Sequence, residues 1–99
     1  MVAFDPAIGG EIQKTRPAAV LSNDTANAQL NRVQVMPVSS QVGRLYPAEA
    51  YIWLNGERRK AMADQITTIS RRRLLRGLGM LGSDDLQAVA RVVMLQLDL

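Results

Sequence analysis

The chain has 99 residues and a mass of 10.9 kDa, with 47% apolar residues, 21% charged residues and a formal net charge of +3. This length suits a single domain over residues 1–99, and it excludes two large domains or a long solenoid. Because a chain of this size buries a modest share of its surface on folding, we expect dimer formation to contribute to its stability.

The sequence contains neither cysteine nor histidine. Their absence excludes disulfides, cysteine nucleophiles, thiolate or imidazole metal sites and a Ser-His-Asp triad. Any catalysis must therefore use arginine, lysine, carboxylate, hydroxyl or backbone groups. The sequence has no apolar run of transmembrane length and no leader pattern, so we expect a soluble, cytoplasmic protein.

The first third of the chain predicts short extended segments separated by loops. Residues 1–4 are apolar and extended in character, and Asp5-Pro6 ends this run. Residues 7–16 are expected to form a flexible loop. Residues 17–22 predict a short buried strand, and residues 24–31 predict a second loop.

The middle of the chain carries the clearest strand patterns. Residues 32–40 alternate between apolar and polar positions, and Pro37 indicates a strand edge or a bulge because proline has no N–H. Residues 46–54 predict a further strand, with Glu49, Tyr51 and Trp53 on one face. Asn55-Gly56 then predicts a tight turn. For Tyr51 and Trp53 both base stacking and packing in the core or a dimer are open, with packing favoured.

The last third predicts one more strand and a helix. Residues 60–69 are interpreted as a strand, and residues 71–76 as either a short helical turn or a strand. Ser83 is the expected N-cap of an amphipathic helix of about 14 residues, with acidic residues in its first turn. Several short strands and one terminal helix predict a small, mainly β, barrel-like domain.

Positive charge is concentrated in residues 57–76, which hold seven basic and two acidic residues. Such an excess favours a polyanion or an acidic protein as partner. A solvated sheet edge is an equally good reading of the same cluster.

Two groups of short motifs, taken in order along the chain, together point to a known protein family. The first group is Asp5-Pro6, Gly9-Gly10-Glu11 and Arg16-Pro17-Ala18-Ala19-Val20-Leu21-Ser22. The second group is Val35-Met36-Pro37-Val38-Ser39-Ser40-Gln41, Tyr46-Pro47-Ala48-Glu49-Ala50 and Ala63-Asp64-Gln65-Ile66-Thr67-Thr68-Ile69. Each motif is weak alone, but together they cover nearly the whole chain, and in this order they resemble the MazF/PemK family of toxin ribonucleases.

The resemblance implies an SH3-like barrel of the CcdB/MazF type that forms a homodimer. It implies a sequence-specific, metal-independent endoribonuclease (an mRNA interferase) that cleaves single-stranded RNA in a prokaryotic cytoplasm and uses no cofactor. It also implies inhibition by a cognate MazE-like antitoxin with an acidic C-terminal segment.

The family's catalytic positions map by resemblance to Arg16 and Ser39. An arginine can hold the scissile phosphate in bidentate fashion and stabilise its added negative charge, and a hydroxyl can donate to the phosphate or the leaving oxygen. The general base is open between Glu11, Asp64 and water, and a reaction that rests mainly on electrostatic stabilisation is a further alternative. Further RNA-binding or assisting residues implied by the resemblance are Gly9, Gly10, Glu11, Ser40, Gln41, Asp64 and Gln65.

One departure from the family keeps other functions open. Family members usually begin with a strand that starts before the position of Met1, so either the natural start lies upstream of Met1 or the first strand is truncated. A short first strand would weaken the barrel. A CcdB-like protein that binds DNA gyrase without chemistry is one alternative, although the C-terminus lacks the Trp-Gly-Ile ending of those proteins. A module that only sequesters an antitoxin or nucleic acid is another.

Overall fold

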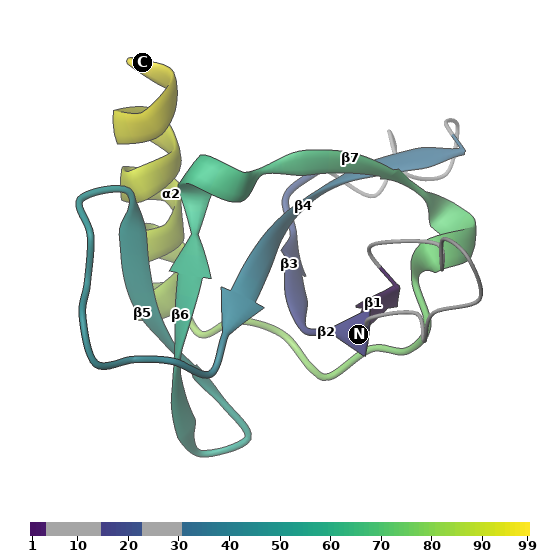
Figure 1. Cartoon of the computed structure of the whole chain (residues 1–99), viewed down its shortest axis with the longest axis horizontal. Helices are drawn as coiled ribbons and strands as arrows, with labels where there is room; N and C mark the ends of the chain where they lie inside the picture. Colours follow the sequence, from purple (N-terminus) through teal and green to yellow (C-terminus); the bar gives the residue numbers. More distant parts are fainter. Residues whose placement is uncertain (4–14, 23–30) are drawn as a thin grey trace, which may run out of the picture.

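A curled antiparallel sheet forms the centre of the fold, and a C-terminal helix packs against it (Figure 1). The computed structural model describes residues 1–3, 15–22 and 31–99. The strands are β1 (Val2–Ala3), β2 (Thr15–Arg16), β3 (Ala18–Val20), β4 (Arg32–Ser39), β5 (Glu49–Leu54), β6 (Glu57–Met62) and β7 (Thr67–Ser70), and the helix is α2 (Ser83–Leu97). The order of the main sheet is β3-β4-β6-β5, with β7 also paired to β4, while β1 and β2 form a two-stranded sheet. The predicted mainly β fold with a C-terminal helix is confirmed.

The long strand β4 pairs with three other strands. On one edge it pairs with β3, and on the other it pairs first with β7, through residues 32–35, and then with β6, through Val38 and Ser39. Pro37 lies between these two partners, at a point where no N–H is needed for pairing on that edge. The predicted sheet edge or bulge at Pro37 is therefore wrong. Pro37 lies within a central strand, at the point where β4 changes its partner from β7 to β6.

The single strand expected over residues 60–69 is wrong. The structure divides it into the end of β6, a 3-10 turn η1 (Ala63–Gln65) and β7. The N–H of Ala63 donates to the carbonyl of Ala48 at 2.9 Å, and the N–H of Ile66 donates to the carbonyl of Ala63. These bonds turn the chain so that β7 leaves β6 and pairs with β4. Residues 71–73 form a second 3-10 turn, η2, so the helical-turn alternative is correct.

The main core lies between the sheet and α2. Small and branched side chains of β4, β5 and β6 pack against Val89 and Val92 of the helix. The helix is close to its predicted length, but its N-cap is Gly82 rather than Ser83. At the β5–β6 turn, Asn55 and Gly56 both have positive φ angles, 52° and 78°, as a tight hairpin turn requires.

A second core lies on the opposite face of the sheet, where the sheet curls over itself. It contains Val2 of β1, Val33 and Val35 of β4, and Ile69 of β7. Because side chains alternate along a strand, Ser39 shares this face of β4 with Val33 and Val35. The curl therefore encloses one end of this face and leaves the end near Ser39 open.

The link between β5 and α2 gives a direct stability prediction. The backbone N–H of Trp53 donates to Oδ2 of Asp85 at 2.9 Å, so a residue in the first turn of α2 also binds the outer edge of β5. Asp85→Ala removes this charge-assisted bond and a favourable helix-dipole contact, so we expect the free energy of unfolding to fall by about 1–2 kcal/mol. Urea denaturation measures this change. Asp84→Ala, in the same helical turn, is the control and is expected to cost about half as much or less; equal losses would contradict the assignment.

A groove of about 460 Å³ lies beside the short β1, between β3 and residues 74–81. Val2 forms an isolated bridge with Leu74, and the Met1 ammonium donates to the carbonyl of Arg76 at 2.8 Å. Partial burial and the nearby charge of Arg76 lower the pKa of this ammonium below its ordinary value. Within the described residues, no helix has the length and apolar character needed to cross a bilayer.

Candidate active site

A row of side chains crosses the sheet on the face away from α2, which we call the open face where it is not covered by the curl of the sheet. Ser39 of β4 lies opposite Lys60 of β6, and Lys60 lies opposite Tyr51 of β5. Residues directly opposite each other in antiparallel strands point to the same face. The three side chains therefore form one row that runs perpendicular to the strands.

The β3–β4 register extends this row to Arg16. Ala18 lies opposite Pro37, and the N–H of Val38 donates to the carbonyl of Pro17 at 3.0 Å. The same register, continued by one residue beyond Pro17 and Val38, sets Arg16 opposite Ser39. These positions form a pair without mutual backbone hydrogen bonds, the closer of the two pair types in an antiparallel ladder. The row thus reads Arg16, Ser39, Lys60 and Tyr51 across four strands.

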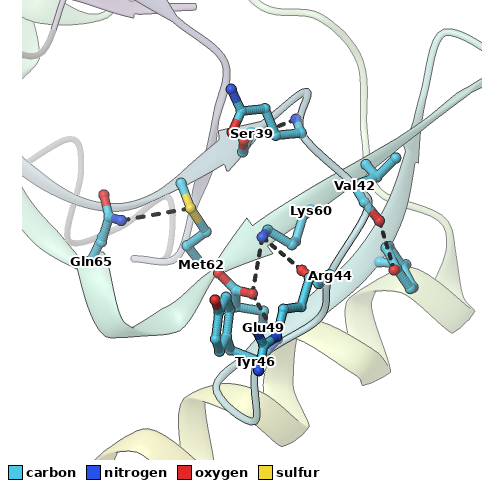
Figure 2. Close-up of polar contacts among 10 residues, drawn as sticks. Ser39, Val42, Arg44, Tyr46, Glu49, Lys60, Met62 and Gln65 are labelled. Atoms are coloured by element: carbon cyan, nitrogen blue, oxygen red, sulfur yellow. Dashed lines mark hydrogen bonds and ion pairs between the residues drawn. The ribbon is translucent and has the colours of Figure 1, made fainter.

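The arginine and the serine at the start of this row differ in their surroundings. Arg16 is exposed, and the part of the chain that the structure describes offers it no ion-pair partner. Ser39 is partly buried, and its Oγ accepts the backbone N–H of Gln41 at 3.1 Å (Figure 2). This bond occupies one lone pair and leaves the hydroxyl hydrogen available to a ligand on the open face.

Lys60, the next member of the row, is a buried cation with two oxygen partners. Its Nζ lies 3.1 Å from Oε1 of Glu49 and donates to the carbonyl of Arg44 at 2.9 Å (Figure 2). Oε1 of Glu49 also accepts the N–H of Tyr46 at 2.8 Å. The Lys60 and Glu49 side chains are only 10% and 8% exposed. This pair fixes the segment before β5 against β6, and it fixes the floor of the open face beside Ser39.

Sequence reasoning missed this pair because it counted Lys60 within the basic cluster. That cluster is divided in the structure. Arg58 and Lys60 point to the open face, while Arg59 alternates to the other side and pairs with Glu57. Arg71 and Arg72 are exposed in η2. The strand period of two in β6 was the available signal for separating these residues.

Aromatic rings and guanidinium groups line the far end of the open face. The Arg58 guanidinium lies 4.8 Å from the ring centre of Tyr51 and 5.5 Å from that of Trp53. The hydroxyl of Tyr51 donates to the carbonyl of Val42 at 2.8 Å. As predicted, Glu49, Tyr51 and Trp53 share one face of β5, but Trp53 is 57% exposed and lies outside the core.

The remaining predicted site residues fall in three places. Ser40 and Gln41 follow β4 directly, and both are exposed next to Ser39. Asp64 and Gln65 lie in η1, where Asp64 is exposed and Gln65 Nε2 donates to Sδ of Met62 at 3.6 Å (Figure 2). Gly9, Gly10 and Glu11 lie outside the described residues. Among the residues that are described, no group of three or more potential ligands could hold a metal ion.

Comparisons with known proteins agree on one family. The family model described as PemK-like, MazF-like toxin of type II toxin-antitoxin system matches residues 1–97. Endoribonuclease MazF9 of Mycobacterium tuberculosis (strain ATCC 25618 / H37Rv) is 36% identical over 107 residues, covering 99% of this chain and 91% of that protein.

Solved structures show the same fold. The crystal structure of MazF (Form-I) from Deinococcus radiodurans has a TM-score of 0.80 at 28% identity, covering 99% of this chain and 90% of that one. MazE-MazF (Form-I) from the same organism has a TM-score of 0.74 at 28% identity, covering 85% and 83% of the two chains. The ordered motifs, the curled sheet and the family match lead to one conclusion: the chain belongs to the PemK-like, MazF-like toxins of type II toxin-antitoxin systems.

Proposed function

We propose that this chain is an endoribonuclease toxin that cleaves single-stranded RNA, including mRNA, at a short specific sequence and without a metal ion. The observation that carries the proposal is the register that sets Arg16 opposite Ser39 on the open face. The similarity to an endoribonuclease over 99% of the chain supports the same reaction class.

RNA brings its own nucleophile to this site, the 2′-OH next to the scissile phosphate. In the proposed reaction the 2′-oxygen bonds to phosphorus while the bond from phosphorus to the 5′-oxygen breaks. The 2′-hydroxyl proton goes to a base and the leaving 5′-oxygen receives a proton. The products are a 2′,3′-cyclic phosphate, or a 3′-phosphate after hydrolysis, and a 5′-hydroxyl end.

The two site residues have distinct parts in this scheme. Arg16 binds the non-bridging phosphate oxygens and stabilises the charge that grows as the phosphorus becomes five-coordinate. Ser39 donates its hydroxyl hydrogen to the phosphate or to the leaving oxygen, because its bond with the Gln41 N–H uses the oxygen as acceptor and leaves this hydrogen available. Asp64, Glu11 and water remain the candidates for the base.

Two kinds of protein partner accompany the proposal. A cognate MazE-like antitoxin with an acidic segment is proposed to neutralise the toxin, because a related MazF chain is solved together with MazE. A homodimer is proposed because α2 leaves Met94, Leu95 and Leu97 exposed. Exposed apolar side chains on one element are typical of protein interfaces. The proposed location, the prokaryotic cytoplasm, follows from the toxin family to which the chain belongs.

A cleavage assay tests the function. The purified protein is incubated with a long RNA in EDTA, and the fragment ends are identified by mass. We expect discrete cuts at one short motif, with cyclic phosphate or 3′-phosphate ends and 5′-hydroxyl ends. Cleavage that EDTA abolishes, or 5′-phosphate ends, would contradict the proposed chemistry. A folded protein that makes no cuts would leave only a binding role.

A further inference from the structure

Trp53 is a large, exposed side chain on the open face, and it has no role in the hydrophobic core. The inner face of β5 packs in the core through Ala50 and Ile52, so Trp53 is not needed to hold the strand in place. Its backbone is already fixed by Asp85, and its ring is left 57% exposed.

Arg58 holds this ring in a defined arrangement. Arg58 lies directly opposite Trp53 in the β5–β6 register, and its guanidinium stacks over both Trp53 and Tyr51. Tyr51 is in turn fixed by its hydrogen bond to Val42. The two rings and the cation therefore form a preorganised unit, which we call the Trp53 platform (Tyr51, Trp53 and Arg58).

The chemistry of the Trp53 platform matches a nucleobase next to a phosphate. Every base has a π-face that can stack on an aromatic ring, and arginine adds a cation–π contact and attracts the polyanionic backbone. A basic patch with interleaved aromatic residues is the usual way in which proteins bind single strands. An acidic or purely apolar partner would use only one half of this unit.

The Trp53 platform lies on the same face of the sheet as the proposed cleavage site. Tyr51 belongs to the same cross-strand row as Ser39, two strands away, and Trp53 follows two residues later on the same face. With strands about 4.8 Å apart, Tyr51 and Ser39 are separated by about 10 Å. Trp53 lies two residues, or about 7 Å, further along β5, which puts its backbone about 12 Å from Ser39. A nucleotide flanking a phosphate held at Arg16 and Ser39 can reach the indole over this distance.

We propose that the Trp53 platform is a stacking subsite for a nucleobase adjacent to the scissile phosphate of single-stranded RNA. This inference rests on the proposed function, which identifies the bound nucleic acid as single-stranded RNA. Stacking is tolerant of base identity, so the subsite contributes affinity and register along the strand more than it selects one base. Trp53 is thus a binding residue, and Arg58 positions its ring.

Trp53 is the only tryptophan in the chain, so its own fluorescence reports on this subsite. The wild-type protein is titrated with an all-2′-deoxy oligonucleotide, which lacks the nucleophile and stays intact. An oligonucleotide of equal length with abasic sites carries the same phosphates and is the matched control. We expect saturable quenching by the first and little or none by the second.

Substitutions complete the test, with binding measured by the anisotropy of a labelled oligonucleotide. Trp53→Ala is expected to weaken binding about 10-fold or more, while Trp53→Phe keeps most of the affinity. In cleavage of RNA the Ala variant should raise KM with little change in kcat, since stacking acts equally in ground and transition states. Circular dichroism checks that both variants fold.

The outcomes separate this inference from the proposed function. Base-dependent quenching without any RNA cleavage would support the Trp53 platform and overturn the nuclease. Normal cleavage with an unchanged KM in a folded Trp53→Ala protein would overturn the platform and leave the nuclease. Fluorescence that changes on dilution but not with oligonucleotide would assign the indole to contact with a second copy, and would also overturn the proposal.

Discussion

Replacing Arg16 by alanine is expected to lower the rate of RNA cleavage by about 1000-fold, while the protein stays folded. A preorganised cation or donor at a developing oxyanion contributes about 10²–10³ to kcat, and Arg16 is the side chain proposed to hold the phosphate. The side chain is exposed, so its loss should leave the free energy of unfolding within about 0.5 kcal/mol of the wild-type value. Single-turnover cleavage at saturating RNA measures the rate.

Two further variants make this test specific. Arg16→Lys keeps the charge but loses the bidentate geometry, so most of the activity should still be lost. Arg32→Ala removes an exposed arginine at the start of β4, far along the strand from Ser39, and should leave the rate unchanged. Wild-type cleavage by a folded Arg16→Ala protein would overturn the assigned role.

Replacing Glu49 by alanine is expected to lower the free energy of unfolding by about 3–5 kcal/mol. The change leaves the Lys60 ammonium buried without its carboxylate, and breaking a buried pair from one side costs about this much. It also removes the acceptor of the Tyr46 N–H. For a domain of this length each kcal/mol shifts the midpoint of thermal unfolding by about 4–8 °C, so the variant should unfold at least 12 °C lower.

The solvent-exposed pair between Arg59 and Glu57 supplies the control. Glu57→Ala should change the free energy of unfolding by less than about 1 kcal/mol, because the Glu57 side chain is 68% exposed. The double variant Glu49→Leu with Lys60→Met removes both charges and should recover most of the loss. Equal unfolding midpoints for Glu49→Ala and Glu57→Ala would show that the buried pair contributes nothing.

Local sequence signals predicted the elements whose partners lie close in the chain. The Asn55-Gly56 hairpin and the C-terminal helix depend on turn chemistry and on a period of 3.6, and both can be recognised from the sequence. The break between β6 and β7 depends on a bond from Ala63 to Ala48, which no pattern within residues 60–69 displays. Pro37 was placed at an edge because its second partner strand was unknown.

The candidate site could be predicted only in part, because it depends both on family resemblance and on strand registers that the sequence does not display. Arg16 and Ser39 were assigned by resemblance, and only the β3–β4 register sets them opposite each other. Lys60 and Glu49 were not paired because they are 11 residues apart and meet through a chain reversal and a strand register. Exposure of Trp53 could not be predicted either, because strand alternation fixes its face but not what covers that face.

The cross-strand row has a consequence for how such a protein can diverge. Its spacing is set by the separation of strands, so insertions in the connections between strands leave Arg16 opposite Ser39. A single-residue deletion within β4 would instead turn the hydroxyl toward the α2 side of the sheet. Loop lengths can therefore change without disturbing the proposed catalytic pair, while the length of β4 itself is under strict constraint.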